Sequence, residues 1–234
     1  MITPTNIYLL IFAYLMGSIP SAVWIGKYFY KTDVREYGSG NAGATNVFRV
    51  LGKKAGIPVL LLDVLKGFGG VCLAVFSSYS RGSTQFTNLE LVLGMAALVG
   101  HIFPIFAQFR GGKGIATLLG IIMGVHLFAG LISIAVFTTV LLISNYVSLA
   151  SILSSIFFPI IVLIIGKIVT PTATHLSMIP AFTKPLLIFS ILIPIMVIIT
   201  HQKNIERLLR KEESKSKLIK KKVKKNEPAE IELD

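Results

Sequence analysis

The sequence predicts an all-α fold, a polytopic membrane helix bundle. Hydrophobic residues fill 53% of the 234 positions and charged residues only 15%, against about 25% charged residues in a typical soluble domain. The charges are also concentrated: 11 of the 23 lysines and arginines follow Thr200, and six more lie between Lys27 and Lys54. The long apolar runs between these segments suit a lipid bilayer, which about 20 apolar residues cross as one helix.

Six apolar segments make up the bundle. Five of them have the length and composition of one crossing each: 7–25, 57–79, 89–109, 149–168 and 185–200. The remaining segment, 115–143, holds 29 residues, which is more than one straight crossing needs. We expect it to form two short helices, the fourth and fifth of seven transmembrane helices. His126 is the candidate turn between them, and Gly120, Gly124 and Gly130 are further places to break.

The basic residues predict the orientation and support the count of seven. Loops enriched in Lys and Arg stay in the cytosol, so the loop 27–54 and the C-terminal tail should both be cytosolic, with the N-terminus outside. A single crossing at 115–143 would leave the basic tail outside, whereas two crossings return it to the cytosol. We therefore expect one membrane domain over residues 1–210. Residues 211–234 should form a charged, disordered cytosolic tail, to which we assign no function.

The first of three polar clusters is a loop between the first two spans, from Gly38 to Asn46, followed by Arg49. Glycines let a backbone approach a ligand closely and point its N–H groups at an anion, and a guanidinium forks onto phosphate. An ordinary glycine and asparagine turn is the plain alternative. The candidate site residues of this cluster are Ser39, Gly40, Asn41, Gly43, Thr45, Asn46 and Arg49.

Two further polar clusters follow the third and the last spans. The run Arg110-Gly111-Gly112-Lys113-Gly114 places a lysine at the start of a helix, where free N–H groups attract anions; a basic anchor on lipid headgroups is the alternative. It is not a nucleotide-binding P-loop, because glycine and not Ser or Thr follows Lys113. His201, Asn204 and Arg207 are spaced to share one face of a helix. The predicted orientation puts all three clusters on the cytosolic side, where they could form one site.

The charged pair Asp63 and Lys66 lies inside the second predicted span, three residues apart. Charges at that depth usually face the bundle and pair, so we expect a structural ion pair that supports the site from below. Such a pair also suits our alternative function, a transporter of a small phosphorylated metabolite. A transporter, however, should present polar residues near the middle of the membrane and to both faces. A lipid-binding protein with a basic tail is a third class.

Two classes of partner are not expected. The positive-inside rule accounts for the basic residues without a nucleic acid. Cys72 is the single cysteine, and no metal site is predicted.

In order, the clusters resemble the three motifs of one family. Ser39-Gly-Asn-Ala-Gly-Ala-Thr-Asn46 with Arg49, Gly111-Gly-Lys-Gly114 preceded by His101 and Phe103-Pro104, and His201-x-x-Asn204-Ile-x-Arg207 are similar to those of the bacterial acyl-phosphate:glycerol-3-phosphate acyltransferases, PlsY. Asp63-Val-Leu-Lys-Gly67 and Asn145-Tyr-Val-Ser148-Leu-Ala150 fit as well. The resemblance covers residues 17–210.

The resemblance implies an enzyme that moves an acyl chain from acyl phosphate to the sn-1 hydroxyl of glycerol 3-phosphate. The products would be lysophosphatidate and phosphate, in an early step of phospholipid synthesis, with no cofactor and no metal. It also implies a multi-pass protein of the bacterial cytoplasmic membrane whose active site faces the cytosol. The enzyme would contact membrane lipid and work as a monomer, with the enzyme that makes acyl phosphate as a candidate partner.

Roles for individual residues also come from the resemblance. Ser39, Lys113, His201 and Asn204 would be catalytic and, with Arg49, would hold glycerol 3-phosphate and the reacting carbonyl. The loop Gly40–Thr45 would bind the phosphoryl group of acyl phosphate. The other candidate substrate-binding residues are Asn46, Gly111, Gly112, Gly114, Ser148 and Arg207. By the same resemblance a substrate phosphate would take the hydroxyl proton, and His201 is the other candidate base.

Overall fold

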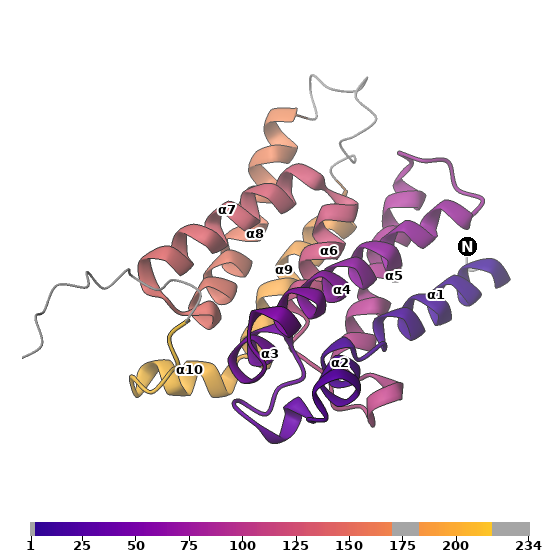
Figure 1. Cartoon of the computed structure of the whole chain (residues 1–234). Coiled ribbons are helices and arrows are strands. Elements are labelled where there is room, and N and C mark those ends of the chain that lie inside the picture. The colour runs from indigo at the N-terminus through magenta and orange to yellow at the C-terminus, as the bar shows by residue number, and fades with distance from the viewer. Residues whose placement is uncertain (1–2, 170–182, 217–234) are drawn as a thin grey trace, which may run out of the picture.

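The regular elements of the computed structural model are helices throughout the described residues, which are 3–169 and 183–216. The α-helices are α1 (Pro4–Gly17), α2 (Ser21–Tyr30), α3 (Ala44–Val50), α4 (Lys53–Cys72), α5 (Thr84–Ile102), α6 (Ile115–Val125), α7 (Leu127–Ser144), α8 (Val147–Val169), α9 (Lys184–Thr200) and α10 (Gln202–Leu209). Short 3-10 turns cover Val34–Glu36, Leu73–Phe76 and Ile105–Ala107. The long helices pack side by side, as Figure 1 shows, so the prediction of an all-α bundle is confirmed for these ranges.

Four stretches of the described chain are long and apolar enough to cross a membrane: Lys53–Phe76, Thr84–Ala107, Leu127–Ser144 and Val147–Lys167. Two bent pairs, α1 with α2 and α9 with α10, bring the number to six if each pair counts as one span. The first pair bends by 40° where Pro20, which has no N–H to donate, precedes α2. The count of seven and the orientation stay predictions.

The segment 115–143 divides into two helices, as the sequence predicts. The break falls at His126, which ends α6 and caps α7 by accepting a hydrogen bond from the N–H of Ala129 at its Nδ1 (3.4 Å). With 11 residues α6 is short, but α7 has 18 residues and is long enough to cross. The expectation of two short helices is therefore confirmed only for α6. The expected breaks at the glycines are wrong: Gly120 and Gly124 lie inside α6, and Gly130 lies inside α7.

The helices α4 and α6 cross at backbone contact. A Cβ atom on Gly67 would lie 2.0 Å from the carbonyl oxygen of Thr117, and one on Gly120 would lie 2.0 Å from that of Val64. Small residues allow this close packing, which helices in lipid need because burial from water does not drive their association. The crossing places the start of α6 beside α4 and so positions the loop that precedes α6.

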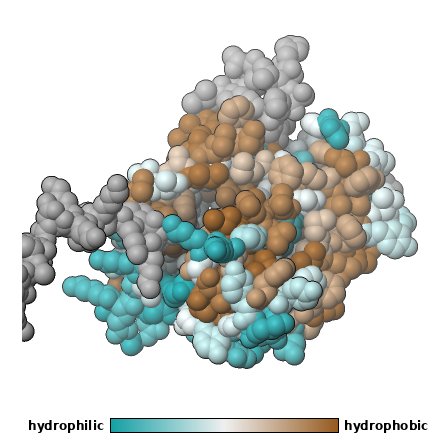
Figure 2. Space-filling view, viewed as in Figure 1, coloured by the Kyte–Doolittle hydropathy of each residue, from teal (hydrophilic) through white to brown (hydrophobic). Residues whose placement is uncertain are grey.

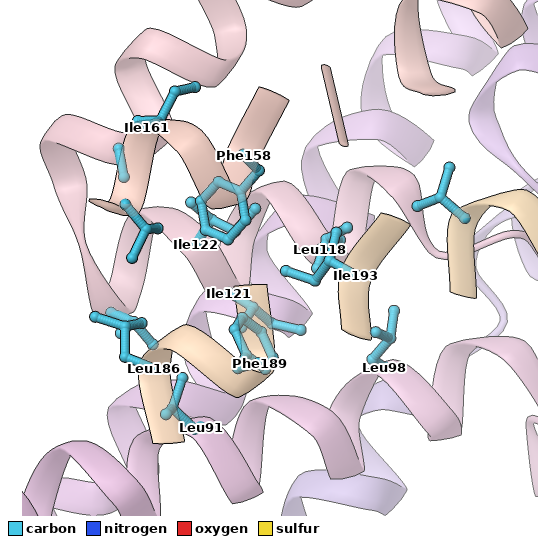
Figure 3. Close-up of a cluster of buried hydrophobic side chains, with 14 of the residues drawn as sticks. Leu91, Leu98, Leu118, Ile121, Ile122, Phe158, Ile161, Leu186, Phe189 and Ile193 are labelled. Carbon is cyan, nitrogen blue, oxygen red and sulfur yellow. The ribbon is translucent and has the colours of Figure 1, made fainter. Parts of the chain in front are cut away.

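The central core lies on the other face of α6. Ile121 and Phe158 are among its most buried side chains, and it continues through Leu98 of α5 and Ile193 of α9 (Figure 3). Hydrophilic residues gather at one end of the bundle, over α3 and α10, while hydrophobic residues cover much of the rest of the visible face (Figure 2). The polar loops are thus carried on a rigid apolar body.

We predict that Gly67→Ala destabilises the protein by about 1–3 kcal/mol, because the added methyl group meets backbone that cannot rotate away. The measurement is the thermal unfolding midpoint in detergent. Gly69→Ala is the matched control on the same helix. Its methyl group would meet the flexible Met16 side chain, with Sδ at 3.0 Å, and alanine favours the helix. Equal midpoints for the two variants would contradict the close crossing.

Candidate active site

The three polar clusters meet at one end of the bundle. The Nζ of Lys113, in the loop between α5 and α6, donates a hydrogen bond to Oδ1 of Asn204 on α10. Gly112 lies against the first loop, where a Cβ atom would be 3.1 Å from the carbonyl oxygen of Ala42. These contacts bring together the three clusters, which we expected to share one site.

Asn46 braces the first loop. Its Nδ2 donates to the carbonyl oxygens of Val34 (2.8 Å) and Tyr37 (3.0 Å), and its Oδ1 accepts the N–H of Ser39 (2.8 Å). Both amide protons are therefore used within the loop. We expected Asn46 to bind substrate, but the structure gives its buried side chain the task of holding the loop around Ser39 in shape.

The other predicted residues of the first loop lie nearer the solvent. Ser39, Gly40, Thr45 and Arg49 are exposed, and Asn41 and Gly43 are half-buried. Arg49 has no ion-pair partner among the described residues. Its guanidinium is close enough to Lys113 to lower the pKa of that lysine. Arg49, on α3 just after the loop, is therefore an unpaired cation near Lys113 among the described residues.

The second loop is fastened to the end of α5. The N–H groups of Gly111 and Gly112 donate to the carbonyl oxygens of Ile102 and His101, each at 3.2 Å. The His101 ring lies so close to Gly112 that a Cβ atom there would be 2.3 Å from its Nε2. Only glycine fits this position, so His101 shapes the loop that presents Lys113. At the end of the loop, Gly114 precedes α6.

His101 connects this loop to the predicted ion pair. The Asp63 carboxylate lies 3.0 Å from Nζ of Lys66 and 3.6 Å from Nδ1 of His101, and it accepts a hydrogen bond from the Ser21 hydroxyl. Lys66 also donates to the carbonyl oxygen of Ile19 (2.9 Å) at the break between α1 and α2. The ion pair is thus present and buried, and it lies within reach of the site through His101.

The third cluster carries a histidine with a defined tautomer. Nδ1 of His201 lies 2.8 Å from the carbonyl oxygen of Val197, which can only accept a hydrogen bond. Nδ1 therefore carries the proton, and Nε2 of the neutral ring keeps a lone pair. His201 is buried at the end of α9, and the following bend of 64° leads directly to Asn204. A proton acceptor therefore lies at the end of α9.

The main residue that the sequence analysis missed is Glu213. Its carboxylate accepts hydrogen bonds from Ser148, Asn204 and Arg207, all of which we expected to bind substrate. The structure therefore places the beginning of the expected solvated tail, residues 211–216, against the bundle, while 217–234 lie outside the described residues. The sequence signal that could have pointed to Glu213 is a carboxylate six residues after Arg207 of the third cluster. The many charged residues around it, however, are typical of a solvated segment.

Burial is the largest influence on the Lys113 ammonium and lowers its pKa to about 8. The carboxylate of Glu213 opposes this change, while the guanidinium groups of Arg207 and Arg49 add to it. Burial also acts to raise the pKa of the Glu213 carboxyl group, but the hydrogen bonds that it accepts outweigh this effect and hold that pKa below the usual range. At neutral pH the site therefore contains a charged lysine with one carboxylate nearby.

The described residues contain no group of three or more His, Cys, Asp or Glu side chains that could hold a metal ion. The groups that do converge are the Lys113 ammonium and the guanidinium groups of Arg49 and Arg207, and such cations recognise phosphate. These features define a class: a helical membrane protein with a cationic polar site at one end of its bundle.

Comparisons with known proteins identify the family. A family model described as glycerol-3-phosphate acyltransferase matches residues 7–211. Curated glycerol-3-phosphate acyltransferases of Staphylococcus aureus strain Newman and Enterococcus faecalis are 42% and 41% identical, covering 90% and 89% of this chain and 98% and 91% of their own. The chain belongs to the glycerol-3-phosphate acyltransferase family, PlsY, and is an integral membrane acyltransferase.

Solved structures agree with this assignment. A crystal structure of PlsY, an integral membrane glycerol 3-phosphate acyltransferase, in its glycerol 3-phosphate form is 38% identical to this chain, with a TM-score of 0.77. The match covers 90% of this chain and 94% of that chain. The lysophosphatidic acid form of PlsY has a TM-score of 0.74 at 36% identity, with the same coverage.

The Lys113 ammonium predicts an alkaline limit to activity. The group is charged below a pH of about 8 and neutral above it, so its attraction for a phosphorylated substrate is lost as the pH rises through that value. We expect kcat/KM for glycerol 3-phosphate, which reports groups of the free enzyme, to fall across this range. Lys113→Arg keeps its charge and should move the fall to higher pH. A wild-type value that stays level well above pH 8 would contradict this role.

Proposed function

We propose that the enzyme transfers an acyl chain from acyl phosphate to the sn-1 hydroxyl of glycerol 3-phosphate, releasing lysophosphatidate and phosphate. The observation that carries this proposal is the joining of a glycine-rich loop, a half-buried lysine and a histidine with a free Nε2 at one polar end. Crystal forms of PlsY with glycerol 3-phosphate and with lysophosphatidic acid support this substrate and product.

The arrangement suits a direct transfer between two phosphorylated substrates. Acyl phosphate is a mixed anhydride, so the hydroxyl oxygen of glycerol 3-phosphate can attack its carbonyl carbon while the bond to the phosphate leaving group breaks. No covalent enzyme intermediate is needed, and catalysis consists of alignment and stabilisation of the oxyanion. Lys113 and Arg49 would hold the phosphate of the acceptor. The N–H groups of the loop Gly40–Thr45 would hold the phosphoryl group of the donor.

The hydroxyl proton has two candidate acceptors. One is a phosphate oxygen of a substrate, and the other is Nε2 of His201, whose lone pair is left free by the bond from Nδ1 to Val197. A base must come within hydrogen-bonding distance of the proton that it takes. Substrate phosphate is the acceptor that the family resemblance favours, and His201 is the alternative.

The membrane setting follows from the same proposal. The polar end would face the cytosol of a bacterium, with the protein in the cytoplasmic membrane and the acyl chain between helices, open to lipid. A monomer would be sufficient for activity, and the enzyme that makes acyl phosphate is a candidate binding partner. Membership of an acyltransferase family argues against the alternative function, a transporter of a phosphorylated metabolite.

The donor is tested by direct comparison. The full chain, purified in detergent, is given glycerol 3-phosphate with either palmitoyl phosphate or palmitoyl-CoA, and phosphate release and the position of the acyl group are measured. We expect turnover with palmitoyl phosphate alone and acylation at the sn-1 position. Product from palmitoyl-CoA but not from palmitoyl phosphate would contradict the proposed donor.

We further predict that Lys113→Ala and Ser39→Ala each lower kcat/KM at least tenfold, which corresponds to about 1.4 kcal/mol in the barrier. The reason is the loss of a donor to a phosphorylated substrate. Controls of the same chemistry come from the opposite end of the bundle: Lys184→Ala at the start of α9 and Ser78→Ala in the turn between α4 and α5. Rates near wild type in either site variant would be evidence against this site.

A further inference from the structure

We propose that Glu213 is a positioning residue of the acyl transfer: it fixes the Asn204 amide and, through it, the Lys113 ammonium that receives glycerol 3-phosphate. The inference rests on the proposed function. Glu213 lies beyond the family match, which ends at residue 211, and in a segment whose composition predicts only a solvated tail.

The contacts of Glu213 connect three separate parts of the chain. Its Oε1 accepts hydrogen bonds from the Ser148 hydroxyl (2.9 Å) on α8 and from Nδ2 of Asn204 (2.6 Å) on α10, and its Oε2 accepts one from Nε of Arg207 (2.7 Å). The residue is 9% exposed. A buried carboxylate that accepts three hydrogen bonds is held in one orientation, because losing any donor would leave charge unsatisfied.

The backbone brings this side chain back to the site. After α10 the N–H of Lys211 donates to the carbonyl oxygen of Leu208 (3.1 Å) and the N–H of Glu212 donates to that of Arg207 (2.8 Å), a Schellman turn that reverses the direction of the chain. Lys211 adopts the left-handed conformation that this turn requires (φ 59°). The segment then runs from α10 to the corner between α7 and α8 (Figure 1), where the N–H of Ser216 donates to the carbonyl oxygen of Asn145 (2.7 Å).

The carboxylate decides which way the Asn204 amide points. An amide has a donor end and an acceptor end, and Nδ2 of Asn204 is directed to Glu213. Oδ1 is therefore the atom that faces Lys113 and accepts its hydrogen bond. Without the carboxylate the amide is free to rotate and turn its own donors towards the ammonium group. Glu213 thus acts on Lys113 through Asn204.

Glu213 also acts on Lys113 through its charge. The cations around Lys113 are Arg207 on α10 and Arg49 on α3, and both lower the pKa of the lysine, whereas the Glu213 carboxylate raises it. Burial lowers the pKa of His201, at the end of α9, to about 4, so its ring is neutral over this pH range. Removing the carboxylate should therefore make the lysine lose its proton at lower pH.

The test compares Glu213→Gln with Glu212→Gln in the full chain, purified in detergent, with palmitoyl phosphate saturating and glycerol 3-phosphate varied. Glu212 is exposed, so its variant removes the same charge one residue away without touching the site. We expect Glu213→Gln to lower kcat/KM at least tenfold and to move its alkaline fall to lower pH. Glu212→Gln should change neither.

The outcomes separate the possible failures. No turnover by the wild-type chain would contradict the proposed function itself. Wild-type turnover with equal kcat/KM and equal pH profiles for the two variants would overturn the role of Glu213. A lower KM for glycerol 3-phosphate in Glu213→Gln would also overturn it, because the carboxylate would then be competing with the substrate phosphate. The thermal unfolding midpoint of each variant shows whether it is folded. Glu213→Asp is a second variant that keeps the negative charge, and it should retain the wild-type pH profile.

Discussion

One buried carboxylate, that of Asp63, connects the parts on which the rest of the structure depends. It contacts Ser21 at the start of α2, Lys66 on its own helix and His101 at the end of α5. A charge inside a membrane bundle is costly unless it is paired, so these groups are held together. Through Lys66 the network reaches the break at Ile19, and through His101 it reaches the glycine loop that presents Lys113.

The position of the site at one end of the bundle follows from the need to satisfy backbone polar groups. Within a bilayer every backbone polar group must be satisfied inside the protein, so irregular loops with free N–H groups belong at the ends of the helices. The close crossing of α4 and α6 and the bend after α9 bring three such loops to the same end. There the hydrogen-bond donors and cations of the site lie at the end of an apolar helix bundle (Figure 2).

The balance of charge in the site is set by few groups. Burial and two guanidinium groups lower the pKa of Lys113 and one carboxylate opposes them, so the position of that carboxylate affects the protonation of the lysine. Asn204 transmits the position of the carboxylate to the ammonium group by a single amide. A site built in this way can bind an anionic substrate at neutral pH without keeping a fully buried, unpaired cation.

Composition and spacing were sufficient to predict the helical membrane class, the division of 115–143 and the three polar clusters. These features are local: the apolar runs report the bilayer, and the motifs lie within short segments of chain. Asn46 was expected to bind substrate as a neutral donor in a glycine-rich loop, and only the fold shows that its amide protons are used by Val34 and Tyr37. The sequence placed the break at His126 correctly, but the expectation that both helices are short was wrong for α7, which has 18 residues.

By itself, then, the sequence determined the class of protein, the chemistry of its donors and the family that it resembles. Only the tertiary structure decided which donors face each other: Lys113 meets Asn204 across 91 positions of sequence, and Glu213 meets Ser148 across 65. The physical reason is that a charged residue in a charged segment looks the same whether water or a partner satisfies it. The partner becomes visible only when the chain turns back after α10 and buries the carboxylate.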